Sequence, residues 1–506
     1  MHFARHLSYW ARMRADRPAV TVEGDTLTWS AFDAQAESLA ARFVEMGVTP
    51  GDRVGCLLGN SLEWCVAFAA AIKAEAIFVP FNAAFGPVEL REIEADAAPR
   101  AIVSTASLMR KLGGEADGDE VMLFDRAGGS APQLFAQVAG SRLTLAPRDY
   151  RDDGAPLAIS YTSGTMGQPK GVVLSHAAVH SLCTGLALAY GWTPEERFLI
   201  VAPLAFTGGF ICCLAPVLFL GAHAFVERKY EAGQLLARMA DERITTFGGV
   251  PTLFQRIADC PGFAEADLSS LRHGFTGGAP VSVPLLKAFQ AKGLVIRQSY
   301  GCTEACGFAT LPDATAALTR PGAAGWPMMG MELEVHDDAG NVCGQGEVGE
   351  IWLRGTQMLL HYWNKPDLTA QAHQDGWYKT GDLGKLDEHG AVVVVDRKKN
   401  MIISGGVNVY PAEVERTMAT LPGVSEIVVL GLPSAEWGEE VVAIVHGDAS
   451  AEDLIGGARA LLGSYKAPKR IRKATAPLPR TTSGKIERRD LAALFHSLAE
   501  TELQDG

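Results

Sequence analysis

Hydrophobic positions in the first hundred residues alternate between helical and strand-like spacing. Ser30 is a candidate N-cap for a helix that Gly47 ends, and the apolar residues of one side of this helix are Phe32, Leu39, Phe43 and Val44. The run RVGCLL that follows is typical of a buried strand.

A second round of the same alternation follows directly. Ser61 is expected to open a helix through Ala71, and the run AIFVPF then predicts a strand. A further helical pattern from Val88 leads to a short strand around Ile102. This alternation favours an α/β fold with a largely parallel sheet.

The pattern changes near residues 396–400, where VVVV is followed by the charged cluster DRKKN and by MIISGG, a strand that ends in paired glycines. Pro411 suits the first turn of a helix through Val414 and Met418, after which EIVVLGL and VVAIVHG are expected to alternate with helical stretches. We therefore predict an N-terminal domain, a short connecting segment and a compact α+β domain, with the boundaries 1–396, 397–400 and 401–506.

The length and charge of the chain narrow its function class. A chain of 506 residues exceeds what one hydrophobic core usually organises, so two or more packed units are expected. The formal net charge is −13, from 45 basic and 58 acidic residues. Proteins that bind nucleic acid generally concentrate positive charge, so no nucleic-acid partner is expected. A small, locally basic site for a nucleotide remains compatible with this charge.

The nine cysteines and the apolar runs indicate a reduced, cytoplasmic protein. The cysteine count is odd and contains no Cys-x-x-Cys pair, which favours free thiols. The first residues interleave arginines with apolar residues and lack the apolar core of a secretory signal. The longest apolar run, 210–222, contains Pro216 and is too short to cross a bilayer, so no membrane span is predicted.

Residues 161–171 read YTSGTMGQPKG and follow the apolar run PLAIS. The run combines glycines that let backbone N–H groups approach a ligand, hydroxyl donors and one positive charge, as a phosphate cradle requires. These residues are Gly164, Gly167 and Gly171, then Thr162, Ser163 and Thr165, and finally Lys170. The spacing differs from that of a Walker motif, which disfavours a kinase or a motor. Taken alone, the run could equally be an ordinary flexible loop.

This loop resembles the signature loop of the adenylate-forming superfamily, which includes acyl- and aryl-CoA synthetases, beetle luciferases and the adenylation domains of peptide synthetases. Five further segments are similar to motifs of that superfamily and occur in the same order. They are HGFTGGAP (273–280), SYGCTEA (299–305), WYKTGDLG (377–384), DRKKNMIISGGVNVYPAEVE (396–415) and LPRTTSGKI (478–486). On these motifs the chain is identified as a member of the superfamily, most like acyl- or aryl-CoA synthetases.

The resemblance implies a large N-terminal domain of mostly parallel sheets with flanking helices, which binds ATP and the acid, and a small, mobile C-terminal lid domain. It implies an ATP-dependent carboxylic acid:CoA ligase that forms an acyl-adenylate, releases pyrophosphate and then forms a thioester. The expected co-substrates are ATP and coenzyme A, with Mg²⁺ as the metal ion. A monomer or a homodimer is expected.

The adenylation step brings an anionic carboxylate onto an anionic nucleotide. At about 4 Å and an effective dielectric near 20, each like-charge pair costs roughly 4 kcal/mol, so cations must converge there. The resemblance places Lys485 against both groups and makes Glu304 and Thr165 the Mg²⁺ ligands. In isolation, Lys485 could be a solvated surface lysine and Glu304 a surface carboxylate.

The resemblance also implies which residues bind ATP. Tyr300 would stack on adenine, although a tyrosine alone is more often core packing, while Asp382 and Arg397 would hold the ribose, although either could be a surface charge. The complete implied set is Thr162, Ser163, Gly164, Thr165, Gly167, Lys170, Gly277, Gly278, Ala279, Ser299, Tyr300, Gly301, Thr303, Asp382 and Arg397.

The two half-reactions need different surroundings, and in this superfamily the small domain swivels between them. Lys399 matches the hinge position, although the charge cluster alone would be a solvated linker. Gly405 and Gly406 would leave a narrow passage clear for the pantetheine arm. Because an ordinary thiol is nucleophilic enough to attack an acyl-adenylate, we expect no dedicated catalytic cysteine or Ser-His-Asp triad.

Two positions depart from the usual motifs and bear on the substrate. Met166 replaces a threonine of the phosphate loop, and Phe206 replaces a histidine often found at the entrance to the acid site. The implied acid pocket is apolar and is lined by Phe206, Gly208, Phe247, Gly249, Cys302, Cys306 and Gly307. The expected substrate is a hydrophobic aromatic, alicyclic or medium- to long-chain monocarboxylic acid.

Besides a luciferase-like oxygenation of the adenylate, two alternatives stay open at this point. One is a stand-alone adenylation enzyme that loads the phosphopantetheine of a carrier protein. Such enzymes for amino acids usually place an aspartate where this chain has Thr207, because a buried, unpaired ammonium is costly. The other is a nucleotide-binding protein without catalysis, from which at least one of Lys485, Glu304 and Asp382 should have been lost.

Overall fold

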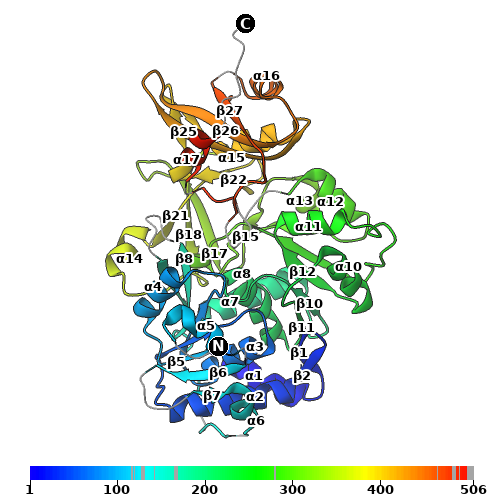
Figure 1. The fold of residues 1–506 in the computed structure, drawn as a ribbon, viewed down its shortest axis with the longest axis vertical. Coiled ribbons are helices and arrows are strands. Elements are labelled where there is room, and N and C mark those ends of the chain that lie inside the picture. The colour runs from blue at the N-terminus through cyan, green and yellow to red at the C-terminus, as the bar shows by residue number, and fades with distance from the viewer. Residues whose placement is uncertain are drawn as a thin grey trace. The chain divides into compact units, whose positions relative to one another are not determined.

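The computed structural model describes residues 1–114, 118, 120–126, 132–141, 143–146, 148–163, 169–277, 281–463, 465–480, 486–488 and 490–498. The chain divides into two compact units. The large unit comprises Met1–Leu333, Leu353–Lys379 and Gly390–Val392, and the small unit comprises Glu334–Trp352, Thr380–His389 and Val393–Gly506. The predicted α/β class, with a large N-terminal sheet domain and a smaller C-terminal domain, is confirmed (Figure 1). The predicted domain boundaries and the hinge at 397–400 stay predictions.

An eight-stranded sheet of the large unit has the order β19-β9-β8-β4-β3-β5-β6-β7. Its central pairs are parallel, as the alternation of helices and strands predicted. The strands are β3 (Arg53–Leu57), β4 (Ile77–Phe81), β5 (Ala101–Thr105), β6 (Val121–Asp125), β7 (Gln133–Leu134), β8 (Pro156–Ser163), β9 (Pro169–Ser175) and β19 (His361–Tyr362).

A seven-stranded sheet of the large unit has the order β14-β13-β12-β10-β11-β1-β2, and all its pairs except β1 with β2 are parallel. Its strands are β1 (Pro18–Val22), β2 (Asp25–Thr28), β10 (Arg197–Ile200), β11 (His223–Val226), β12 (Thr246–Gly249), β13 (His273–Thr276) and β14 (Ile296–Gln298). The longer helices of this part are α7 (His176–Tyr190), α9 (Ala215–Leu220), α10 (Ala232–Asp241), α11 (Pro251–Ala258) and α12 (Val283–Gln290).

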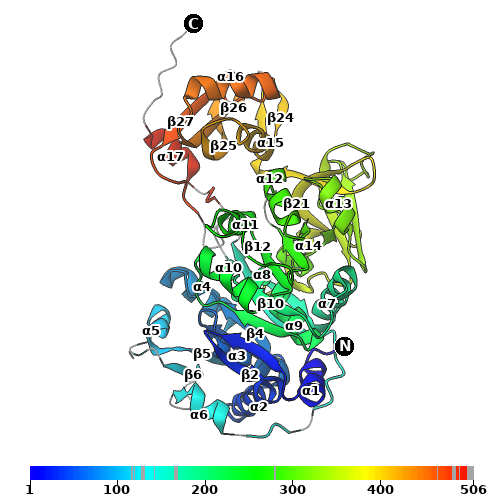
Figure 2. The same cartoon turned by 90° about the vertical axis from the view of Figure 1, so that its right-hand side faces the viewer.

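Helix α3 (Leu62–Lys73) lies between these two sheets (Figure 2). It contacts β1 of the seven-stranded sheet and both β3 and β4 of the eight-stranded sheet, so every residue from Trp64 to Lys73 is buried. A helix that is apolar all round fits such a central position. Lys73 is the charged exception, and its ammonium lies 2.7 Å from the Asp33 carboxylate on α2 (Trp29–Glu45).

The start of α2 differs from the prediction. Thr28, not Ser30, is the N-cap, because its hydroxyl accepts from the Ala31 N–H at 3.2 Å. The Ser30 hydroxyl donates to the Ala15 carbonyl at 2.8 Å instead. The other predicted helices are present as α3, which Ser61 caps, and α4 (Pro87–Ala97). The chain also forms α1 (Ala4–Met13), α5 (Ala106–Met109), α6 (Phe135–Gly140), α8 (Thr207–Gly209), α13 (Ala314–Thr319) and α14 (Pro366–Ala372).

The small unit contains a sheet with the order β24-β23-β26-β25, in which β27 also pairs with β26. Its strands are β23 (Ile402–Ser404), β24 (Val407–Val409), β25 (Val424–Ser434), β26 (Gly438–Gly447) and β27 (Arg470–Ala474), and its helices are α15 (Pro411–Met418), α16 (Ala451–Leu462) and α17 (Leu491–Ser497).

The expected alternation of EIVVLGL and VVAIVHG with helices is wrong, because β25 and β26 form an antiparallel hairpin with no helix between them. Val441, Ala443 and Val445 lie in one core cluster with residues of α15 and α16, and Val442 and Ile444 lie in another with residues of α17. Both faces of β26 are therefore buried, which explains its uninterrupted apolar run.

Further short strands complete the fold. One sheet has the order β17-β18-β21-β20 with β22 beside β21, and β15 pairs with β16. These strands are β15 (Thr310–Leu311), β16 (Trp326–Pro327), β17 (Met331–His336), β18 (Gly349–Gly355), β20 (His373–Gln374), β21 (Trp377–Leu386) and β22 (Val392–Arg397). Within the described residues, we find no helix whose length and apolar character would allow it to cross a membrane.

Candidate functional site

The predicted phosphate loop joins two antiparallel strands of the large unit. Thr162 at the end of β8 lies opposite Lys170 at the start of β9. The Lys170 ammonium lies 5.7 Å from the ring centre of Tyr362. The strands therefore hold both ends of the loop and place one cation beside it. Gly164, Thr165, Met166 and Gly167 lie outside the described residues, as does the side chain of Ser163.

The second and third predicted motifs follow neighbouring parallel strands. Gly277 comes directly after β13 and Ser299 directly after β14. The backbone N–H and the hydroxyl of Ser299 both donate to the Thr276 carbonyl, at 2.9 and 3.0 Å. A side chain added at Gly277 would meet the Ser299 hydroxyl at 3.3 Å, so the structure brings these two positions together. Gly278 and Ala279 lie outside the described residues.

The turn after β14 is tightly folded. Tyr300 is buried, and its carbonyl accepts from the N–H groups of Ala309 and Thr310. A Cβ at Gly301 would lie 2.3 Å from the Gly307 carbonyl oxygen, so only glycine fits there. The turn includes a single helical turn from Thr303 to Ala305, which carries Glu304. The expected role of Tyr300 in adenine stacking stays a prediction.

Two tyrosines that sequence reasoning missed orient Glu304. The Tyr362 hydroxyl donates to a Glu304 carboxylate oxygen at 2.7 Å, and it lies 3.0 Å from the Tyr378 hydroxyl. Burial, followed by the charge of Glu304, raises the pKa of both tyrosines, so both keep their protons. Tyr378 stands within WYKTGDLG, four residues before Asp382, and that proximity was the available signal.

The residues at Glu304 could hold a hard cation such as Mg²⁺ only together with the phosphates of a bound substrate. Glu304 supplies an anionic oxygen donor, which suits Mg²⁺. In the described part of the chain, no three His, Cys, Asp or Glu side chains are arranged to hold a metal by themselves. Mg²⁺ typically binds through one or two carboxylates plus substrate phosphates, and this donor set has that character.

The predicted ribose-binding pair comes together within the small unit. The Arg397 guanidinium lies 2.8 Å from an oxygen of Asp382, which is buried near the middle of β21. The Asp382 N–H also donates to the Thr380 hydroxyl at 3.0 Å. The ion pair holds the Asp382 carboxylate in one orientation, in which it can accept hydrogen bonds from hydroxyl groups.

Asp396, which lies at the predicted domain boundary, anchors the predicted hinge. One of its oxygens accepts from the Arg397 N–H at 2.6 Å and from the Asn400 side chain at 3.0 Å. The other oxygen accepts from the Ala412 N–H at 2.7 Å, in the first turn of α15. Lys399 lies in the single helical turn Lys398–Asn400 between these anchor points.

The last predicted site segments also belong to the small unit. Gly405 and Gly406 form the turn between β23 and β24, with φ of +59° and +77°, a conformation that favours glycine. Lys485 lies outside the described residues. Glu426 accepts from the Leu478 N–H at 2.6 Å and pairs with Arg480 at 2.5 Å, so the start of the motif that contains Lys485 is held to β25.

Thr207 links three segments that carry predicted site residues. Its hydroxyl lies 2.8 Å from that of Ser160 on β8, the strand that leads into the phosphate loop. It also lies 3.4 Å from the Thr303 hydroxyl, beside Glu304. Thr207 itself follows Phe206 at the proposed entrance to the acid site. The structure therefore joins the phosphate-loop strand, the Glu304 turn and the acid-site loop through one hydroxyl.

The predicted acid-pocket residues lie in different surroundings. The Phe206 ring lies 6.3 Å from that of Phe85, and a Cβ at Gly208 would meet nothing within 4 Å. Phe247 is buried in a core cluster, 5.0 Å from the ring of Phe254, and Gly249 lies against Leu253.

Two of the predicted pocket residues are cysteines. Cys302 is partly exposed and Cys306 is buried. Burial raises the pKa of the Cys306 thiol, as it raises that of its neighbour Cys212, whose sulfur lies 3.5 Å from the Cys306 carbonyl oxygen. A Cβ at Gly307 would meet the Cys212 sulfur at 2.2 Å. Neither buried thiol has the low pKa of a reactive cysteine.

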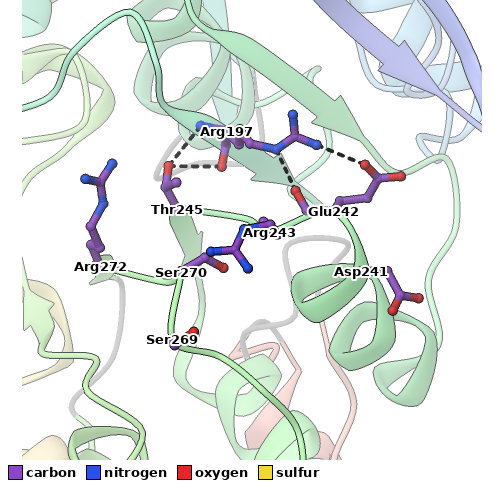
Figure 3. A pocket seen from close by; sticks show the side chains of 8 residues that line it. All are labelled: Arg197, Asp241, Glu242, Arg243, Thr245, Ser269, Ser270 and Arg272. Carbon is purple, nitrogen blue, oxygen red and sulfur yellow. Dashed lines mark hydrogen bonds and ion pairs between the residues drawn. The ribbon is translucent and has the colours of Figure 1, made fainter.

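A separate polar pocket of about 590 Å³ lies where β10, β12 and β13 begin (Figure 3). Arg197 pairs with Glu242 at 2.9 Å and Arg272 pairs with the buried Glu196 at 2.8 Å. The residues that line this pocket include none of the predicted site residues. They are Arg197, Asp241, Glu242, Arg243, Thr245, Ser269, Ser270 and Arg272. In the large unit, the predicted residues Thr162, Gly277 and Ser299 lie instead at or directly after the carboxyl ends of β8, β13 and β14, where ligands of open α/β sheets usually bind.

Comparison with known proteins identifies the family. Residues 7–363 match the model of the AMP-binding enzyme family, and residues 413–485 match that of the AMP-binding enzyme C-terminal domain. The chain is 34% identical over 503 residues to the long-chain-fatty-acid–CoA ligase FadD13 of Mycobacterium tuberculosis, covering 95% of this chain and 97% of the relative. It is also 34% identical to a feruloyl-CoA synthase of Amycolatopsis sp, covering 96% and 97%.

Solved structures support the same assignment. The o-succinylbenzoate CoA synthetase of Bacillus subtilis in complex with its acyl-adenylate intermediate superposes with a TM-score of 0.85, at 27% identity, covering 98% of this chain and 99% of that one. The ATP-bound MatB of Rhodopseudomonas palustris gives 0.85 at 27% identity, covering 97% and 98%. The chain therefore belongs to the adenylate-forming AMP-binding enzymes, is most like their acyl- and aryl-CoA synthetases, and is an acid–CoA ligase.

Proposed function

We propose that this enzyme activates a hydrophobic monocarboxylic acid as its acyl-adenylate and transfers the acyl group to coenzyme A. The observation that carries the proposal is the convergence at Thr207, which connects the phosphate-loop strand, the Glu304 turn and the acid-site loop. Adenylation needs these three elements together, because the carboxylate must meet the α-phosphate at a charge-neutralised point.

In the first half-reaction, a carboxylate oxygen of the acid forms a bond to the α-phosphorus of ATP, and the bond from that phosphorus to the departing pyrophosphate breaks. Mg²⁺, when bound, supplies positive charge at the phosphate oxygens. Glu304, held by Tyr362, would ligate it together with Thr165, and Lys485 would lie against the reacting carboxylate and the α-phosphate. Asp382, oriented by Arg397, would accept hydrogen bonds from the ribose.

In the second half-reaction, the sulfur of coenzyme A forms a bond to the acyl carbonyl carbon and the bond from that carbon to the AMP oxygen breaks. AMP leaves with the electron pair, and the thiol proton passes to solvent. Gly405 and Gly406 would border the passage for the pantetheine arm. Because the leaving group is so good, the enzyme needs no thiolate of its own, which agrees with the raised pKa of the buried Cys306.

The substrate class is the first point to test. Three of the relatives are named for ligation of long-chain fatty acids, ferulate and indoleacetate, each of which carries a carboxylate on a largely apolar body. With Mg-ATP, coenzyme A and a panel of acids, we expect mass spectrometry to detect acyl-CoA products of aromatic, alicyclic or medium- to long-chain monocarboxylic acids. A preference for acetate, an amino acid or a dicarboxylate would contradict the proposed class.

The role of Tyr362 gives a second test. Tyr362→Phe removes the hydroxyl that donates to Glu304, so we expect the adenylation rate at limiting Mg²⁺ to fall about 3- to 10-fold, in line with roughly 1 kcal/mol for one hydrogen bond. The Mg²⁺ concentration for half-maximal rate should rise. Tyr150→Phe is the matched control, because it removes a part-buried hydrogen bond to the Lys73 carbonyl. An unchanged Mg²⁺ dependence would refute the positioning of Glu304 by Tyr362.

A further inference from the structure

The side-chain amide of Asn60 is buried, and its hydrogen bonds join it to loops that follow strands of the seven-stranded sheet. It follows β3 of the eight-stranded sheet and is 7% exposed. Its side-chain nitrogen donates to the carbonyls of Ala202 and Glu227, at 3.1 and 3.0 Å. Its side-chain oxygen accepts from the Leu204 N–H at 2.8 Å. Both donor hydrogens and the acceptor are therefore in use.

The partners of Asn60 lie in the loops after two strands of the seven-stranded sheet. Ala202 and Leu204 follow β10, and Glu227 follows β11. The loop after β10 then continues through Phe206 to Thr207. Asn60 thus holds the first part of the loop, and Ser160 holds its end through the Thr207 hydroxyl.

The loop between these two anchors leaves little room for adjustment. The Phe206 N–H donates to the Pro203 carbonyl at 3.0 Å. A Cβ at Gly209 would lie 2.3 Å from the same carbonyl oxygen, so the chain packs on itself with backbone contacts. A shift at Leu204 would consequently move Phe206 and Thr207 as well.

We infer that Asn60 is a positioning residue for the acid substrate: by fixing the loop after β10, it sets where Phe206 and Thr207 stand relative to the phosphate-loop strand. The inference rests on the proposed location of the acid site at this loop. Asn60 touches neither ATP nor the acid in this account. Its effect is therefore on binding and alignment of the acid, where a misplacement of about 1 Å can reduce the rate about 100-fold.

The most informative variant keeps the shape of the Asn60 side chain and removes its two hydrogen-bond donors. Asn60→Asp leaves an acceptor for the Leu204 N–H but turns a carboxylate toward two carbonyl oxygens. Asn60→Ala is the milder variant, since a cavity of about 470 Å³ that Asn60 lines can admit water to the groups left behind. Ser104→Ala is the matched control, because it deletes a buried hydrogen bond to the Leu57 carbonyl at the same end of the sheet.

The experiment is acid-dependent exchange of labelled pyrophosphate into ATP, measured on the full chain with an acid that the wild type accepts. For Asn60→Asp we expect kcat/KM for the acid to fall about 10- to 100-fold while KM for ATP stays within about twofold. Asn60→Ala should show the same selective change in smaller degree. Ser104→Ala should lower the melting temperature without changing kcat/KM for the acid.

Three results would decide against the positioning role. These are an unchanged kcat/KM for the acid in both Asn60 variants, an equal loss toward ATP and acid, or the same selective loss in Ser104→Ala. If Asn60→Asp does not fold, Asn60→Ala decides by the same criteria. A wild-type enzyme without acid-dependent exchange would instead refute the proposed function, so the two failures are distinguishable.

Discussion

Glu304→Gln is expected to slow adenylate formation about 100- to 1,000-fold, the range seen when one electrostatic stabiliser of a transition state is removed. The variant removes the negative charge that we propose for Mg²⁺ binding but keeps an oxygen that can accept from the Tyr362 hydroxyl. The turn that carries Glu304 should therefore stay folded. The measurement is the single-turnover rate of pyrophosphate release across a range of Mg²⁺ concentrations.

The control for this prediction is Glu332→Gln, which neutralises an exposed carboxylate of the large unit. Glu332 pairs with Arg354 at the surface, and such pairs contribute about 0–1 kcal/mol, so its adenylation rate should match the wild type. If Glu304→Gln kept the wild-type rate and the wild-type Mg²⁺ dependence, Glu304 would not be the metal ligand. An equal melting temperature for both variants would show that any loss is chemical.

Lys485→Ala is expected to abolish acid-dependent pyrophosphate exchange while leaving thioester formation from supplied acyl-AMP largely intact. The physical reason is the like-charge cost of about 4 kcal/mol when a carboxylate meets the α-phosphate, which corresponds to roughly 1,000-fold in rate if no cation offsets it. The second half-reaction joins a thiol to a neutral carbonyl carbon, so it does not depend on that cation. The two half-reactions are measured separately by exchange and by acyl-CoA formation.

Lys473→Ala serves as the comparison for Lys485→Ala, since it removes the same charge from β27 of the small unit. It should leave both half-reactions unchanged. An equal loss of both half-reactions in Lys485→Ala would count against the proposal that the small domain presents Lys485 in one step and withdraws it in the next by a swivel at Lys399.

Local sequence pattern predicted the first alternating helices and strands of the large unit. The helix that Ser61 caps and the strand that precedes it were both predicted from spacing and capping chemistry alone. The start of α2 was misplaced because Thr28 and Ser30 are both competent caps. The contact of Ser30 with the carbonyl of Ala15, which is 15 residues away in the sequence, decided between them.

The β25–β26 hairpin shows a second limit of local pattern. A strand buried on one face shows alternation of apolar and polar residues, but β26 packs against helices on both faces and so reads as a continuous apolar run. Such a run does not indicate which element comes next, so a helix was expected where the chain turns directly back.

For the candidate site, ordered motifs determined the family and named Glu304, Asp382 and Arg397, because the residues of one motif are neighbours in the sequence. Only the tertiary structure assigned the supporting contacts of Tyr362 with Glu304 and of Asn60 with Leu204. These partners are 58 and 144 residues apart, and one hydrogen bond between distant segments leaves no periodic trace in either of them. Local motifs thus identify the residues that are proposed to carry out the chemistry. The alignment of those residues depends on which strand ends the packed sheets bring together.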